Sequence, residues 1–317
     1  MLGAAHKPGA LPLRPLGLGD IYDAAFKVIR FNPKATVGAA VLVAAVAMAA
    51  PALAAAAIAA GLGLAADGSG DLATADDAAT VLAFGSIAVG SALQYVGLVF
   101  VTGMIAHVVA AAAIGRRLTL GEAWAATRGR RWRLVGLTVV IGLIWILALT
   151  VYVVASAALV VVGDSTLVSV GWFLVTIPAL LVLLAWTWIR LTYLAVPALM
   201  LERTGVFAAL GRGYRLTRRQ FWRTFGIALL TVLITSVASQ VLSVPFSIAG
   251  SIASIGFSDS TAGLLVYVVS TALGTVASTA FVAPFTAAVT SVQYLDQRMR
   301  KEAYDVELMA QAGITAA

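Results

Sequence analysis

Six long apolar stretches constrain the fold of this chain more than any other feature of its sequence. They cover roughly residues 36–65, 79–114, 134–162, 167–200, 221–249 and 262–294. Each exceeds the about 20 apolar residues that a helix needs to cross a bilayer. Charged residues make up only 11% of the chain, whereas about 25% is typical of soluble domains. We therefore expect an all-α fold, a polytopic membrane helix bundle with six transmembrane helices.

The apolar stretches divide the chain into three parts. Residues 1–35 should form a flexible N-terminal tail and then an amphipathic interfacial helix, because the expected helix has one apolar side and one basic side. Residues 36–294 should form the six-span transmembrane domain, and residues 295–317 a cytoplasmic C-terminal tail. The first 20 residues contain no continuous apolar stretch of the kind that a cleavable signal peptide requires.

Lysine and arginine are distributed very unevenly between the loops. All but one of the 21 lie in the N-terminal segment, in 115–133, in 202–224 or in the C-terminal tail, and the loops at 66–78, 163–166 and 255–261 contain none. The positive-inside rule then predicts that both termini lie in the cytoplasm. Arginine outnumbers lysine, and alanine and glycine are abundant, which suggests a GC-rich bacterial genome, so we expect a bacterial inner (plasma) membrane. The same asymmetry accounts for the net charge of +7 without a nucleic-acid partner.

A short basic amphipathic segment precedes the first, third and fifth apolar stretches, and two spans follow each time. This pattern leaves open a threefold internal repeat, and a chance likeness between basic inner loops is the alternative. Two segments carry the spacing of a capping box, in which a side chain at the start of a helix pairs with one three residues later. These are Thr119 with Glu122, and Thr217 with Gln220.

Arg190 is the only charged residue well inside an apolar stretch. An ionisable residue at membrane depth is by default a functional-site hypothesis. One interpretation is structural, with Arg190 bracing a neighbouring helix or reaching the interface. The other is that Arg190, with Tyr193 and Glu202, binds an anionic lipid headgroup or solute. We expect a cytoplasmic basic face beside it, formed by Arg212, Arg215, Arg219 and Arg223.

Polar and small residues inside the spans have a simpler interpretation. Gln94 and Gln240 are expected to form hydrogen bonds between helices. Ser270, Gly274 and Ser278 recur at four-residue spacing, and small residues at this spacing let two helix backbones approach closely.

No catalytic constellation is recognisable in the sequence. The chain has no cysteine and two histidines, His6 and His107, whereas a metal site needs three or four ligands. The spans contain no pair of carboxylates for acid–base chemistry. The glycine pattern at 61–66 follows a membrane helix instead of a strand, so it does not indicate dinucleotide binding. We therefore expect no enzyme activity, no metal and no cofactor.

The stretch with Arg190, Pro197, Glu202 and RGYRLTRRQFWRTFG resembles a bacterial membrane family. It is similar to the membrane domain joined to some glycerophosphoryl diester phosphodiesterases and to related stand-alone actinobacterial membrane proteins of unknown function. The N-terminal PLGLGDIYDAAFKVIRFNP fits the same group. The resemblance covers most of the chain and implies a six-span helical domain. It does not imply phosphodiesterase activity, because that chemistry belongs to a separate soluble barrel.

These observations predict an integral membrane protein without catalysis of its own that organises lipid or a protein partner at the cytoplasmic face. Its expected partners are anionic membrane lipids and a soluble or membrane protein, and self-association stays open. The alternative is a transporter of an amphipathic or anionic solute that uses Arg190. Prolines 51, 178, 197 and 245 favour transport, whereas a shortage of polar residues to line a pathway counts against it.

Overall fold

The computed structural model describes residues 9–66, 72–162, 165–256 and 261–313. These residues are almost entirely helical, and no strand occurs among them. Six helices in the described part of the chain are long and apolar enough to cross a membrane, which confirms the all-α, six-span fold class. The candidate spans are Pro33–Leu53, Ala88–Ala113, Arg131–Val161, Thr166–Leu201, Phe221–Ala253 and Leu265–Glu302.

The order of the helices repeats one pattern three times, a short helix followed by two long ones. The first unit has α1 (Leu18–Phe31), α2 (Pro33–Ala66) and α3 (Leu72–Ala113). The second has α4 (Leu120–Ala126), α5 (Arg131–Val162) and α6 (Thr166–Thr187), followed by the π-helical η1 (Trp188–Thr192) and by α7 (Ala195–Leu201). The third has α8 (Val206–Thr217), α9 (Phe221–Gly256) and α10 (Thr261–Glu302), and then α11 (Tyr304–Gln311).

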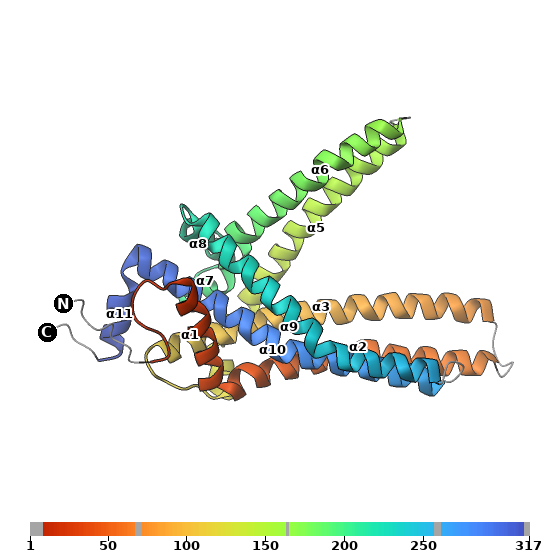
Figure 1. The fold of residues 1–317 in the computed structure, drawn as a ribbon, viewed down its shortest axis with the longest axis horizontal. Helices are drawn as coiled ribbons and strands as arrows, with labels where there is room; N and C mark the ends of the chain where they lie inside the picture. The colour runs from red at the N-terminus through yellow and green to blue at the C-terminus, as the bar shows by residue number, and fades with distance from the viewer. Residues whose placement is uncertain (1–8, 67–71, 163–164, 257–260, 314–317) are drawn as a thin grey trace.

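The three pairs of long helices are packed differently. Figure 1 shows α2, α3, α9 and α10 running together along the long axis, while the α5–α6 hairpin splays away from them. The structure describes every residue of α6, and none of them is buried. Apolar side chains on such a helix are stable when hydrocarbon surrounds them. The short helices α1, α7, α8 and α11 gather at one end of the bundle (Figure 1).

Small residues bring the paired helices together, as the spacing around Gly274 predicted. A Cβ atom added to Gly274 of α10 would lie 3.1 Å from the Cβ of Phe246 on α9. Between α3 and α2, a Cβ on Gly97 would lie 2.2 Å from Cγ1 of Val43. Both helix pairs therefore rely on the absence of a side chain at one position.

The N-terminal segment departs from the expected flexible tail over the residues that the structure describes. Leu11 and Leu16 are fully buried in the hydrophobic core, although residues 9–17 form no helix. Helix α1 packs against α10, and the ring of Phe26 lies 4.8 Å from that of Phe285, although 41% of Phe26 stays exposed. Burial of apolar side chains between the two helices is favourable.

One of the two predicted capping boxes is confirmed and the other is wrong. The Glu122 backbone N–H donates to the Thr119 hydroxyl at 3.3 Å, and the Thr119 backbone N–H donates to the Glu122 carboxylate at 2.7 Å. Thr217, by contrast, is the last residue of α8, and its hydroxyl donates to the carbonyl of Gly213 at 3.0 Å. The spacing to Gln220 is therefore only a sequence coincidence, because Thr217 ends a helix where a cap would begin one.

Candidate functional site

Arg190 lies on η1, where the fourth span changes direction. The backbone N–H of Tyr193 donates to the carbonyl of Trp188 at 2.8 Å, which is the wide turn of a π-helix. The chain then leaves regular helix at Tyr193 and Leu194 and restarts as α7. Single π-helical turns occur frequently at functional sites. The break lies before Pro197, which occupies the first turn of α7, where proline is tolerated.

The guanidinium of Arg190 is held by aromatic rings. Its Cζ atom lies 5.3 Å from the ring centre of Tyr214 on α8 and 5.5 Å from that of Phe221 on α9. Among the described residues, no group hydrogen-bonds to its buried Nε and Nη1 atoms. A cation in this position gains from the rings but keeps donors that an anion could satisfy. The surroundings of Arg190 are therefore compatible with both interpretations, bracing of neighbouring helices and binding of an anion.

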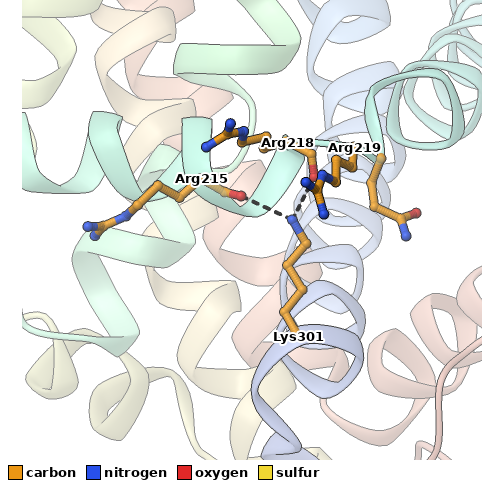
Figure 2. A pocket seen from close by; sticks show the side chains of 5 residues that line it. Arg215, Arg218, Arg219 and Lys301 are labelled. Atoms are coloured by element: carbon orange, nitrogen blue, oxygen red, sulfur yellow. Dashed lines mark hydrogen bonds between the residues drawn. The ribbon is translucent and has the colours of Figure 1, made fainter.

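Lys301, near the end of α10, has several charged groups in its surroundings. Arg190, Arg219 and Arg212 repel its charge, whereas Glu302 attracts it. Its Nζ atom donates to the carbonyls of Arg215 at 3.0 Å and Arg218 at 2.8 Å, so it caps the C-terminus of α8 (Figure 2). A cation at a helix C-terminus is favourable because the last carbonyls carry partial negative charge.

A cavity of about 500 Å³ opens at this junction, and we call it the basic pocket. It is lined by Arg215, Arg218, Arg219, Gln220 and Lys301. Figure 2 shows Lys301 reaching from α10 to the end of α8, with the arginine side chains spread around it. Arg219 adopts a left-handed conformation (φ 65°) that turns the chain from α8 into α9. No acidic residue of the described chain lines this pocket, so an anion could bind to its three arginines and to the remaining donor of Lys301.

The acidic residues at this end are engaged elsewhere, and Glu202 is the first example. Its carboxylate lies 2.8 Å from Nε of Arg212 and 3.4 Å from Nε of Arg298, and it accepts a hydrogen bond from the Tyr294 hydroxyl. Arg212 also pairs with Glu302. Burial opposes the charge on Arg212, but its hydrogen bonds with the two carboxylates outweigh burial and raise its pKa. This network fastens α8 and the residue after α7 to α10.

Asp296 forms the second acidic centre and is fully buried. Its carboxylate lies 2.6 Å from Nη1 of Arg223 and 2.9 Å from Nε of Arg300, and it accepts the backbone N–H of Leu16 at 2.8 Å. Both guanidinium groups also donate to the carbonyl of Leu16. Arg223 is therefore a tie between α9, α10 and the N-terminal segment.

The expected site residues thus separate into two groups. Arg190, Arg215 and Arg219 form no ion pair with any residue that the structure describes. Arg215 and Arg219 line the basic pocket. Glu202, Arg212 and Arg223 are held in ion pairs, and Tyr193 is buried with its ring edge-on to Trp188 at 5.6 Å.

Arg218 and Lys301 are site residues that the sequence reasoning did not select. Lys301 stands more than 80 positions from the α8 arginines, and only the fold brings it to them. Arg218, in contrast, adjoins Arg219 in an arginine-rich run that the sequence displays directly.

Chemically, the arrangement offers charge and hydrogen-bond donors. No group of three or more potential metal ligands occurs among the residues that the structure describes. His107 has positively charged Arg130 and Arg203 in its surroundings, which disfavour a cation beside it.

Comparisons with family models, with curated proteins and with solved structures give no match. The resemblance to phosphodiesterase-linked membrane domains therefore stays a prediction, and the functional argument rests on the geometry of the site.

Proposed function

We propose that this protein is a non-catalytic integral membrane protein that binds and organises anionic lipid at the face bearing its basic pocket. We place that face on the cytoplasmic side of a bacterial inner membrane. The positive-inside rule favours the cytoplasmic side for a face rich in arginine and lysine. The observation that carries the proposal is the surplus of cations around Lys301, with four cationic side chains lining one pocket and no acid among the described residues lining it. A protein partner with an acidic surface is the alternative occupant of the same face.

The position of Arg190 supports a headgroup more than a solute path across the membrane. The charge of Arg190 acts on Lys301, and α7 and α8, which follow η1 in the chain, lie near α1 at one end of the bundle (Figure 1). A phosphate in the basic pocket would bond to the arginines that line it, and Arg190 would add the field of a further cation. Charge-assisted bonds of this type are the strong ones in proteins.

The test compares two triple variants in nanodiscs of phosphatidylcholine with a small fraction of phosphatidylglycerol. Arg215→Gln, Arg218→Gln and Arg219→Gln remove three of the four positive charges of the pocket. The control, Arg116→Gln, Arg128→Gln and Arg133→Gln, removes the same charge from exposed positions outside it. Each basic residue near an anionic lipid contributes about 1 kcal/mol, so the pocket variant should bind phosphatidylglycerol at least about tenfold more weakly.

Native mass spectrometry would count the phosphatidylglycerol molecules retained by each form. The variant Arg190→Gln would be measured in the same way. Equal loss from the two triple variants would refute a specific pocket and reduce the effect to general surface charge. Unchanged lipid retention, together with loss of an acidic protein from the pocket variant alone, would replace lipid by a protein partner.

A further inference from the structure

A second cavity, of about 620 Å³, lies between α3, α9 and α10, inside the candidate membrane spans. We call it the neutral groove. Helix α10 packs against both α3 and α9, so it joins the two helices that contribute the other lining residues. Eleven of the sixteen lining residues are Ser, Thr or Gln, and none of these described residues is charged. The sequence analysis singled out Gln94, Gln240 and Ser278 but did not predict that they meet in one cavity.

The polar residues form a stripe on each helix. On α3, Gln94 and Thr102 are eight residues apart, with Leu98 midway between them. On α9 and α10 the same four-residue spacing recurs, in Ser239, Ser243 and Ser247 and in Thr271, Thr275 and Thr279. Residues four apart share one face of a helix, so each helix turns one polar strip towards the groove.

Six of the nine hydroxyl groups that line the groove donate to carbonyls of their own helices. Thr102 donates to the carbonyl of Leu98 at 2.8 Å, Thr275 to that of Thr271 at 3.0 Å, and Ser247 to that of Ser243 at 3.2 Å. A serine or threonine oxygen that donates in this way still has lone pairs to accept with. The groove therefore presents chiefly acceptors, together with the amides of two glutamines.

Helix packing alone does not account for this polar lining. Helices α9 and α10 already meet closely at Gly250, where an added Cβ would lie 3.2 Å from the Cβ of Ser270. Gln94 does form the expected bond between helices, donating to Thr279 at 3.4 Å. The side-chain amide of Gln240 also borders the groove, and a polar group at membrane depth is costly unless a partner satisfies it.

We propose that the neutral groove binds a neutral, polyhydroxylated headgroup, such as the sugar of a glycosylated lipid. Its acceptor-rich surface requires hydroxyl donors from the ligand, and its lack of charge disfavours an ion at membrane depth. Its volume is typical of small-molecule sites, which span about 300–1,000 Å³. Apolar lining residues, including Leu98 and Val282, accommodate the carbon skeleton. The site is independent of the basic pocket, because no cation lines it.

The probe is a monoglucosyl diacylglycerol, carried as a minor component in phosphatidylcholine nanodiscs. Native mass spectrometry would compare its retention with that of the same diacylglycerol without glucose. We expect the glucosyl lipid to be retained at least fivefold more. Gln240→Leu, at an exposed position, and Thr275→Val, which keeps the side-chain shape, should each remove most of this preference.

Thr187→Val is the matched control. Its hydroxyl also donates to its own helix, to the carbonyl of Leu183 at 2.8 Å, but on the exposed surface of α6. This variant should retain the glucosyl lipid like the wild type. If free glucose competes with the glucosyl lipid, the polyol alone suffices as ligand. If free glucose does not compete, the lipid tail is needed. Equal retention of both lipids, or full retention in Gln240→Leu and Thr275→Val, would overturn the proposal.

Discussion

Asp296→Asn is the substitution that should reveal most about how this protein is held together. The change keeps the shape of the side chain and an oxygen for the Leu16 N–H, but it removes the charge between Arg223 and Arg300. The new amide nitrogen would also turn a donor towards one of the two guanidinium groups. The buried acidic centre would then lose the interaction that joins α9, α10 and the N-terminal segment.

The size of the effect follows from burial and from the remaining partners. Breaking a buried ion pair costs about 3–5 kcal/mol. Both arginine side chains are 28% exposed, and both still donate to the carbonyl of Leu16, at 2.7 and 2.6 Å. Water and that carbonyl compensate part of the loss, so we expect the free energy of unfolding to fall by about 2–3 kcal/mol.

The matched control is Asp23→Asn, the same chemical change in an exposed i,i+4 pair with Lys27. The side chains of this pair are 56% and 43% exposed, and such pairs contribute only about 0.3–0.5 kcal/mol. Unfolding by sodium dodecyl sulfate in mixed micelles, followed by tryptophan fluorescence, would measure both variants. If Asp296→Asn destabilised the protein no more than Asp23→Asn, the buried centre would not be a determinant of stability.

Two further substitutions test local packing and capping. Gly97→Ala should destabilise the α2–α3 pair by about 1–3 kcal/mol in the same assay, because the new Cβ overlaps Val43. Gly85→Ala on the same helix is the control. Its new Cβ meets nothing within 4 Å, so this change should be neutral or stabilising. The backbone N–H and hydroxyl of Thr119 lower the pKa of Glu122, so its stabilisation is present above the unfolded-state pKa and is lost as pH falls through the lower folded-state value. The protection of the α4 amides, corrected for the slower intrinsic exchange in acid, should therefore fall on acidification, and Glu122→Gln should remove this pH dependence; an unchanged profile in Glu122→Gln would contradict the assignment.

The architecture was predictable because the membrane leaves few alternatives. An apolar stretch of this length can satisfy its backbone in lipid only as a helix or a closed barrel, and the long uninterrupted runs favoured helices. The capping box at Thr119 and Glu122 was equally local, since both partners lie within four residues. By contrast, α10 continues through position 302, past the expected end of the sixth span at 294, because its polar last turns are stabilised by partners far away in sequence.

The candidate site was only partly predictable, because its ion pairs also join residues that are far apart in sequence. Arg190 and the α8 arginines stand out as charges, but the sequence does not show which of them meet an acid. Arg212 and Arg223 resemble their neighbours in type and spacing, and only the fold brings Glu202, Glu302 and Asp296 to them. The neutral groove was missed because its residues are individually unremarkable and come from three separate helices.

The bond between Leu16 and Asp296 has a consequence for how the chain is assembled. The two residues are 280 positions apart, so the N-terminal segment emerges from the ribosome long before its anchor exists. Contacts of such large sequence separation are slow to form because the loop between them must close first. Leu11 and Leu16 therefore cannot reach their final buried positions until α10 is inserted. Translation of the last helix is then the step that closes this end of the molecule, and a chain truncated before position 296 should leave it open to proteases.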